Sequence, residues 1–571
     1  MLRHLLAPLV ALSFTGCATI APPAPASTEA IAGPISGSVS AADPRAEDAG
    51  REMLRRGGSA TDAAIAVMLA LTVVEPQSSG IGGGGFLVRG MRDGSVKTYD
   101  GRETAPAAAT PDWFLKPDGT LPPFGESVRS GLSVGVPGNI ALAMRAHADH
   151  GRLPWAELFE PAIRLARDGF QINPRLHGSL SASRDRAAFT SLGRELFFDE
   201  TGEPRPVGHL VTNEPLARTL EEIAADPAHF YTGPDAAEWS EAIAGATPRP
   251  SGMAAEDFAN YRAKTRDPVC GTYRAHRVCS MGPPTSGGVV VLQMLGMLER
   301  FDLAALGLRD PRTWHLFVEA QRLAYADREL YLADSDFVSV PLEGLLDPAY
   351  LARRSALIAS GSTIDTVEPG RPAGAPHALA DGDEPEEKGT THFAIVDADQ
   401  TMISYTSTVE GPFGSGLMVG GFYLNNELTD FSRSPTVDGR PVANRVEGGK
   451  RPRSSMSPVV IYDPQGRPLL AIGAAGGATI PVQTARSIVG IIDFGLSAED
   501  ALGLPFIMAG GDGVFVEQGT WLADTIPALV ALGHGEVSTR PVGLKAGAVL
   551  RTEAGWISAR DPRIEAQVAL P

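Results

Sequence analysis

Two threonines, Thr390 and Thr408, stand where they could form a pair of reactive hydroxyls. Each belongs to an apolar, β-branched run, and Asp397-Ala-Asp-Gln400 between the two runs has the composition of a turn. A hairpin that pairs Val396 with Thr401 would bring Thr408 beside Thr390. Taken alone, the pattern favours an ordinary hairpin whose threonines suit a strand.

A pair of glycines could complete such a centre. Gly476 and Gly477 precede Thr479-Ile-Pro481 and a helix-like run that continues to Ile492. Unhindered backbone N–H groups at a helix start can hold the negative oxygen that forms when a hydroxyl attacks an amide. A glycine-rich turn between a strand and a helix explains the same residues equally well.

Several motifs in order decide between these interpretations, because together they closely resemble the γ-glutamyltransferase family of N-terminal-nucleophile hydrolases. Ala394 and Gln400 depart from the family pattern, and the resemblance, which covers nearly everything from Ala41 onward, is weakest over 176–250. The motifs are Tyr99-Asp-Gly-Arg102-Glu-Thr-Ala-Pro, Gly135-Val-Pro-Gly138, Pro283-Pro-Thr-Ser-Gly-Gly288, Gly389-Thr390-Thr391-His392-Phe393, Thr408-Val-Glu410-Gly-Pro-Phe-Gly414, Leu424-Asn-Asn-Glu427-Leu-Thr-Asp430, Lys450-Arg-Pro-Arg-Ser454-Ser455 and Gly473-Ala-Ala-Gly476-Gly477.

The resemblance implies a reaction mechanism. Similar proteins cut themselves before the first threonine of the motif, here at the Gly389–Thr390 bond. Thr390 would then carry a free α-amino group, whose ordinary pKa of about 7.7–8.0 lets it act as base for its own hydroxyl near pH 7. Thr408 would hold that amino group by a hydrogen bond, and Gly476 and Gly477 would form the oxyanion hole.

The resemblance also implies a site for the two α-groups of a γ-glutamyl donor. Arg102 would bind the α-carboxylate with two parallel hydrogen bonds, assisted by the hydroxyls of Ser454 and Ser455. Many members carry Asn or Gln at two of the positions that bind the α-ammonium, whereas all three are acidic here, which should strengthen cation binding. These positions are Glu410, Glu427 and Asp430.

Both the mixed helix and strand patterns and the resemblance favour an α/β (α+β) architecture. The resemblance implies a four-layer αββα sandwich formed by two autocleaved subunits that stay together as a heterodimer. Residues 43–389 would form the large subunit, ending in a mobile acidic linker over 361–389, and 390–571 the small catalytic subunit. We expect helices over 59–71, 139–147, 155–168, 216–225 and 312–330.

The implied activity is that of a γ-glutamyltransferase or glutathione hydrolase. It would cleave γ-glutamyl amides through an ester on Thr390 and pass the γ-glutamyl group to water or to an amino acid or peptide amine. No cofactor or metal is expected. A cephalosporin (glutaryl) acylase and a γ-glutamyl polymer hydrolase remain alternatives, and an unprocessed, lipid-anchored scaffold is the alternative that is not an enzyme.

The N-terminus predicts export. A basic start is followed by ten apolar residues, Leu5 to Phe14, which are too few to span a bilayer. Phe14-Thr15-Gly16-Cys17 resembles a bacterial lipobox, so Cys17 is a candidate lipidation site; an ordinary signal peptide is the alternative. With residues 1–17 as signal and 18–42 as a flexible tether, we expect a periplasmic protein, anchored through Cys17 or otherwise secreted.

The composition limits the classes of binding partner and the number of possible disulfides. Lys and Arg total 49 and Asp and Glu 67, a net charge of −18, which argues against nucleic acid or an anionic membrane as the main partner. Three cysteines exclude a disulfide scaffold. Cys270 and Cys279 could flank a turn between two short strands, and the sequence leaves open whether they form a disulfide.

Three further patterns are best interpreted as structural. Gly80-Ile-Gly82-Gly-Gly-Gly85 matches a dinucleotide motif, but a helix precedes it and a strand follows, which reverses the required order. Gly131-Leu-Ser133-Val-Gly135 matches a nucleophile elbow without the apolar strand that must lead into one. His147 and His150 suit the C-terminus of a helix.

Overall fold

The computed structural model describes residues 37–249, 252–376, 379–382, 389–510 and 513–570. The predicted signal segment, its Cys17 and the tether up to residue 36 therefore lie outside the described residues. Among those that are described, no helix is both long enough and apolar enough to cross a membrane.

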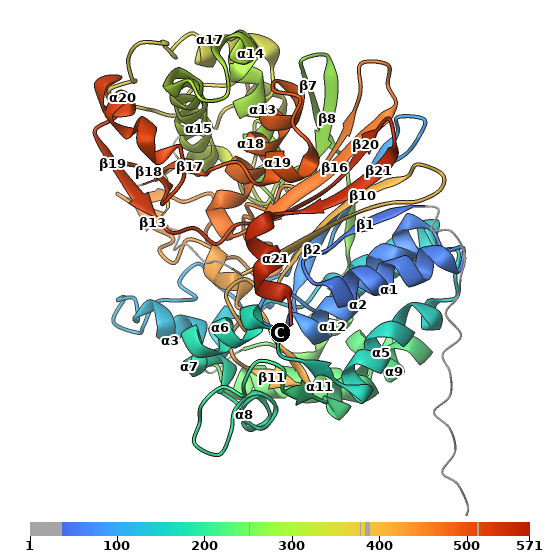
Figure 1. Ribbon diagram of the computed structural model, residues 1–571. Coiled ribbons are helices and arrows are strands. Elements are labelled where there is room, and N and C mark those ends of the chain that lie inside the picture. Colours follow the sequence, from blue (N-terminus) through green and yellow to red (C-terminus); the bar gives the residue numbers. More distant parts are fainter. Residues whose placement is uncertain (1–36, 250–251, 377–378, 383–388, 511–512, 571) are drawn as a thin grey trace, which may run out of the picture. The chain divides into compact units, whose positions relative to one another are not determined.

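Two six-stranded antiparallel sheets form the centre of the protein (Figure 1). The first runs in the order β1 (Ser38–Ser40), β9 (Thr391–Val396), β10 (Met402–Thr408), β2 (Gly84–Gly90), β3 (Val96–Asp100) and β6 (Lys264–Arg266). The second runs in the order β21 (Gly555–Arg560), β20 (Lys545–Thr552), β16 (Pro468–Ala475), β15 (Val459–Tyr462), β8 (His276–Ser280) and β7 (Val269–Tyr273).

The sheets pack face to face, and helices cover the outer face of each, so the predicted four-layer αββα arrangement is confirmed (Figure 1). Helices on the first sheet include α1 (Pro44–Arg55), α2 (Ala60–Val74) and α4 (Asn139–His150), with α5 (Glu160–Asp168) and α9 (Glu214–Ala225) beyond them. The second sheet is covered by α13 (Gly287–Leu298), α18 (Ile480–Ile492) and α19 (Ala498–Leu502), and α15 (Pro311–Tyr331) packs on α13.

Strand β9 is buried on both faces, and this explains its nearly continuous apolar sequence. Phe393 and Ile395 belong to the core shared with α2, whereas Ala394 and Val396 belong to the core between the sheets. Alternate residues of a strand point to opposite faces, so position 390, two residues before His392, leads toward the space between the sheets.

The β9–β10 hairpin exists, but the predicted pairing was wrong by one residue. Val396 pairs with Met402, not with Thr401, and Thr391 pairs with Ser407. The turn is shorter than expected because Asp397 and Thr401 still bond to each other and Gln400 takes a positive φ of 62°. A turn of this kind ends in a left-handed residue, which is where a glycine is usual. The corrected register extrapolates to place Thr408 opposite Thr390.

Local signals explain the helices that support the first sheet. Ser59 caps α2 in a capping box with Asp62, and every residue of α2 is buried. The other predicted helices are also present, with ends shifted by a few residues: α4, the 3₁₀ turn Trp155–Phe159 followed by α5, α9 and α15.

The remaining sequence patterns have structural roles. Helix α2 precedes the glycine run and β2 follows it, as the reversed order predicted. The Ser133 hydroxyl donates to the carbonyls of Val128 and Ser130. His147 and His150 lie in the last turn of α4. Cys270 and Cys279 pair across β7 and β8 and form a disulfide, which answers the question that the sequence left open.

Described parts of the linker over 361–389 bond to the body of the protein. The backbone of Gly370 bonds to Asp327 and Tyr331 of α15. The N–H of Ala380 donates to the carbonyl of Pro441, and the two residues that follow it, Asp381 and Gly382, line the cavity described below.

Candidate active site

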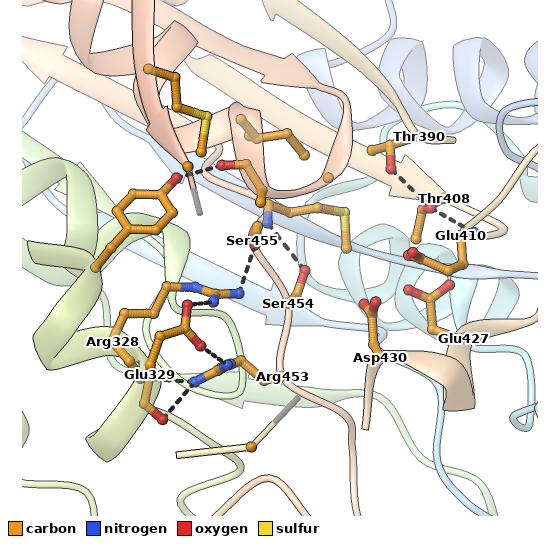
Figure 2. A pocket seen from close by; sticks show the side chains of 18 of the residues that line it. Arg328, Glu329, Thr390, Thr408, Glu410, Glu427, Asp430, Arg453, Ser454 and Ser455 are labelled. Atoms are coloured by element: carbon orange, nitrogen blue, oxygen red, sulfur yellow. Dashed lines mark hydrogen bonds and ion pairs between the residues drawn. The ribbon is translucent and has the colours of Figure 1, made fainter. Parts of the chain in front are cut away.

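Thr390 and Thr408 meet at the end of the β9–β10 hairpin. Their hydroxyl oxygens are 3.0 Å apart and both are buried (Figure 2). The Thr408 hydroxyl also accepts the N–H of Glu410 at 2.8 Å. In this uncut chain the N–H of Thr390 donates to the carbonyl of Ser78 at 3.0 Å, so the contact between Thr408 and a free Thr390 amino group stays a prediction.

The backbone around the predicted cleavage site is tightly constrained. Thr390 has a φ of 78°, a conformation that costs a β-branched residue roughly 1–3 kcal/mol. A Cβ atom added to Gly389 would lie 1.6 Å from the carbonyl oxygen of Glu410. Only glycine can therefore precede Thr390 in this arrangement.

Gly476 and Gly477 form the turn between β16 and α18. Both have positive φ, 125° and 60°, and Gly477 begins a 3₁₀ turn and lines the cavity. Thr479 closes the turn by bonding to the carbonyl of Gly476, and Gln483 bonds to the carbonyl of Ala475. The glycine pair thus lies at a helix start, where backbone N–H groups can hold an anion.

The predicted donor-binding residues meet in one cavity of about 300 Å³, together with Thr390, Thr408 and Gly477. Figure 2 shows three acidic side chains converging below the threonines, and one oxygen of each lies within 4.8 Å of the others. These side chains are Glu410, Glu427 and Asp430.

Arg102 is buried beneath this acidic group and bonds to it directly. Its guanidinium forms ion pairs with Glu427 and Asp430, and it also donates to the carbonyls of Pro452 and Arg453 at 3.2 and 3.0 Å. The side chain of Glu427 is completely buried, whereas that of Asp430 is 22% exposed. Asp430 is therefore the more accessible of the two partners of Arg102.

Ser454 and Ser455 line the same cavity but differ in their contacts (Figure 2). The Ser454 hydroxyl accepts the N–H of Met456 at 3.1 Å. The Ser455 hydroxyl accepts a hydrogen bond from Arg328 of α15 at 2.9 Å. Arg328 also donates to Ser286 and lines the cavity, and sequence reasoning did not single it out.

Glu103 is a second residue that the sequence analysis missed. It follows Arg102 and is fully buried, and neither carboxylate oxygen has a hydrogen-bond partner among the residues that the structure describes. Burial raises the pKa of Glu103 to about 8, against the opposing charge of Arg102 at 3.9 Å. A carboxyl group in this position is largely protonated at neutral pH and so adds little negative charge beside Arg102.

The sequence analysis also missed a cluster of two histidines and one glutamate that does not line this cavity. His315, Glu319 and His534 come within 4.8 Å of one another although His315 and His534 are 219 positions apart. The two histidines bond to each other at 2.8 Å, and Glu319 bonds to Arg322 and to the N–H of Ile364. His315 and Glu319 share one face of α15 at i, i+4 spacing, but nothing in the sequence could have indicated that His534 joins them.

Two antiparallel sheets between layers of helices form the fold of the N-terminal-nucleophile hydrolases. The model of the Gamma-glutamyltranspeptidase family matches residues 46–570, and the chain belongs to this family of hydrolases and transferases. The chain is 36% identical to the glutathione hydrolase proenzyme of Bacillus subtilis (strain 168), over 89% of this chain and 86% of that protein.

Two further similarities span nearly the whole chain. The glutathione hydrolase proenzyme of Escherichia coli (strain K12) is 35% identical, over 96% of this chain and 95% of that protein. A crystal structure of cephalosporin acylase from Bacillus halodurans superposes with a TM-score of 0.79 at 28% identity, covering 92% of this chain and 94% of that one.

Proposed function

We propose that this chain is a γ-glutamyltransferase or glutathione hydrolase that cuts itself between Gly389 and Thr390. The observation that carries the proposal is the Thr390 hydroxyl, which faces Thr408 at the wall of a cavity containing Arg102 and three carboxylates. This cavity offers both signs of charge to the α-amino acid end of a γ-glutamyl donor, next to a hydroxyl nucleophile.

Self-cleavage follows from the constrained backbone. The Thr390 hydroxyl attacks the carbonyl carbon of Gly389, the C–N bond breaks, and the hydroxyl proton passes to the Thr390 nitrogen, which leaves as an amine. Water then hydrolyses the resulting ester and leaves a free carboxylate on Gly389 and a free amine on Thr390. The positive φ of Thr390 raises the energy of the uncut state and is released with the bond.

Turnover repeats the same chemistry on a substrate. The neutral amine takes the hydroxyl proton as Thr390 attacks the γ-carbonyl carbon, and Gly476 and Gly477 stabilise the oxyanion. The proton passes to the leaving amine as the amide bond breaks. The γ-glutamyl ester on Thr390 is then resolved by water or by the amine of an amino acid or peptide.

Donor binding requires the existing ion pairs to rearrange. Arg102 already bonds to Glu427 and Asp430, so a donor α-carboxylate would replace Asp430, the more exposed of the two. The released Asp430 carboxylate, with Glu410 and Glu427, would then bind the α-ammonium. The donor's carboxylate and ammonium would thus replace the ion pair between Arg102 and Asp430 with two ion pairs between donor and protein.

The structural similarity to a cephalosporin acylase motivates one alternative function, which is an acylase whose donor carries a glutaryl group. Such a donor has no α-ammonium and leaves the acidic group without its cation. Comparing the hydrolysis of γ-glutamyl-p-nitroanilide with that of glutaryl-p-nitroanilide separates the two, and we expect kcat/KM for the γ-glutamyl compound to be the larger by at least about 10-fold.

The direct test is the N-terminus of the smaller fragment of the purified protein. We expect a fragment of 182 residues (571 − 390 + 1) that begins Thr-Thr-His-Phe. Thr390→Ala should remain one uncut chain without activity. The matched control is Thr391→Ala, whose hydroxyl bonds to Glu75 and which should mature. An uncut but active chain, or activity in Thr390→Ala, would refute the nucleophile, and an uncut inactive wild type would favour the scaffold alternative.

We also propose export to the periplasm with lipid attachment at Cys17, which rests on the sequence alone. Mass spectrometry of the N-terminal peptide from the native host should find a lipid-modified Cys17. A start after the apolar run with an unmodified residue would instead indicate an ordinary signal peptide.

A further inference from the structure

Lys545 contacts the residue that carries the proposed nucleophile, although nothing in its sequence surroundings predicts a functional role. It opens β20 and pairs with Ala475, the residue just before Gly476. Its Nζ atom donates to the carbonyl oxygen of Thr390 at 3.1 Å. One partly buried side chain therefore connects the backbone of Thr390 to the strand that leads into the glycine turn.

The charges around Lys545 are few. Arg175 forms an ion pair with Glu75 at the end of α2, and it donates to the Ser78 hydroxyl at 3.2 Å. Lys545 lies 3.5 Å from that same hydroxyl. Burial, and secondarily the charge of Arg175, lowers the pKa of Lys545 to about 7, while Glu75 opposes the shift.

Ser78 and Glu75 also contact the residues that would form the new N-terminus. The nitrogen of Thr390 donates to the carbonyl of Ser78, and Glu75 accepts the hydroxyl of Thr391. On the opposite side the cavity presents Arg102 and the three carboxylates already described. His392 on β9 stays neutral because burial lowers its pKa to about 3.

We infer that Lys545 is a positioning residue for Thr390, which holds the Thr390 carbonyl and, through its charge, favours the neutral form of the Thr390 α-amino group after cleavage. This inference rests on the proposed function. An ammonium bonded to the carbonyl of a residue disfavours a second ammonium on the same residue, so the two amines titrate together. The base would then be available at a lower pH than an isolated N-terminal amine allows.

Three variants separate the hydrogen bond from the charge. Lys545→Gln keeps a donor for the Thr390 carbonyl but loses the charge, Lys545→Met loses both, and Lys545→Arg keeps both. Lys97→Gln on β3, which does not line the cavity, is the control. For each protein, the smaller fragment is first confirmed to begin at Thr390, and kcat/KM for γ-glutamyl-p-nitroanilide is then measured from pH 5 to 10.

The inference is tested by the midpoint of the acidic limb in the plot of kcat/KM against pH. Without the charge the amine holds its proton to higher pH, so Lys545→Gln and Lys545→Met should move the midpoint upward. The shift should be less than about one pH unit, because Lys545, whose own pKa is about 7, has already lost part of its charge where the amine titrates. Lys545→Arg should leave it unchanged or move it downward, and Lys545→Met alone should also lower kcat at the optimum.

Two results would overturn the inference. One is an unmoved limb in matured Lys545→Gln and Lys545→Met, and the other is failure of all three folded variants to mature, since the proposed electrostatic role begins after cleavage. Absence of a Thr390 N-terminus in the wild type would instead refute the proposed function itself, so the two failures are distinguishable.

Discussion

At the scale of single residues, the buried Arg102 makes the sharpest prediction about binding. Arg102→Lys keeps a positive charge but loses the planar fork that bonds to Glu427 and Asp430 on one side and to backbone carbonyls on the other. A lost charged hydrogen bond is worth about 1.5–3 kcal/mol, so KM for a γ-glutamyl donor should rise about 10-fold or more while kcat changes little. Steady-state kinetics measure both.

The matched control for this prediction is Arg266→Lys. Arg266 also bonds to carboxylates, those of Asp100 and Asp336, but it does not line the cavity. Its KM should therefore stay near that of the wild type. An equal rise in KM for both variants would mean that Arg102 acts through stability, not through contact with the donor.

Single residues also show which contacts of the site could be predicted from the sequence. The meeting of Thr390 and Thr408 was predictable because a hairpin brings close positions together by local rules. Lys545 and Arg328 were not, because their contacts depend on how distant strands and helices pack. Nor did the sequence show that Arg102 bonds to the same acids that were assigned to the donor.

At the scale of elements, the β7–β8 hairpin gives a test of the disulfide. It forms one edge of the second sheet, and Cys270 and Cys279 close a ten-residue loop there. A disulfide that closes a loop of this length restricts the unfolded chain and so contributes about 2–3 kcal/mol to the free energy of unfolding. Replacing both cysteines with Ala should lower Tm by a few degrees and leave kcat unchanged, since neither cysteine lines the cavity.

A reductant should lower the Tm of the wild type by a similar amount and leave the double variant unaffected. Identical melting of the wild type with and without reductant would contradict the prediction. The bridge also requires an oxidising compartment, so its presence in protein from the native host would support the proposed export.

Elements were easier to predict than their pairing. Apolar residue patterns indicated α2, α4, α9 and α15, since this signal lies within each helix. The hairpin register was wrong by one residue because a turn that ends in a left-handed Gln400 is not signalled by a glycine. The four-layer arrangement followed from the family resemblance, whereas the order of strands within the two sheets was not predicted, because no local pattern determines it.

At the scale of the whole molecule, the fold predicts what cleavage at Gly389–Thr390 does to stability. Both sheets combine strands from the two sides of the cut: β9 and β10 lie between β1 and β2, and β15 pairs with β8. Separating the fragments would therefore break both sheets and expose both cores, at a cost comparable to unfolding the protein.

The cleaved protein should accordingly behave as one folding unit. On size-exclusion chromatography without denaturant, the two fragments should elute together at the position of the uncut Thr390→Ala chain. In calorimetry, we expect one transition for each protein, with Tm values within a few degrees, because the cut adds chain ends without removing strand pairs. Fragments that separate in native buffer would show that the sheets are not shared as the structure describes.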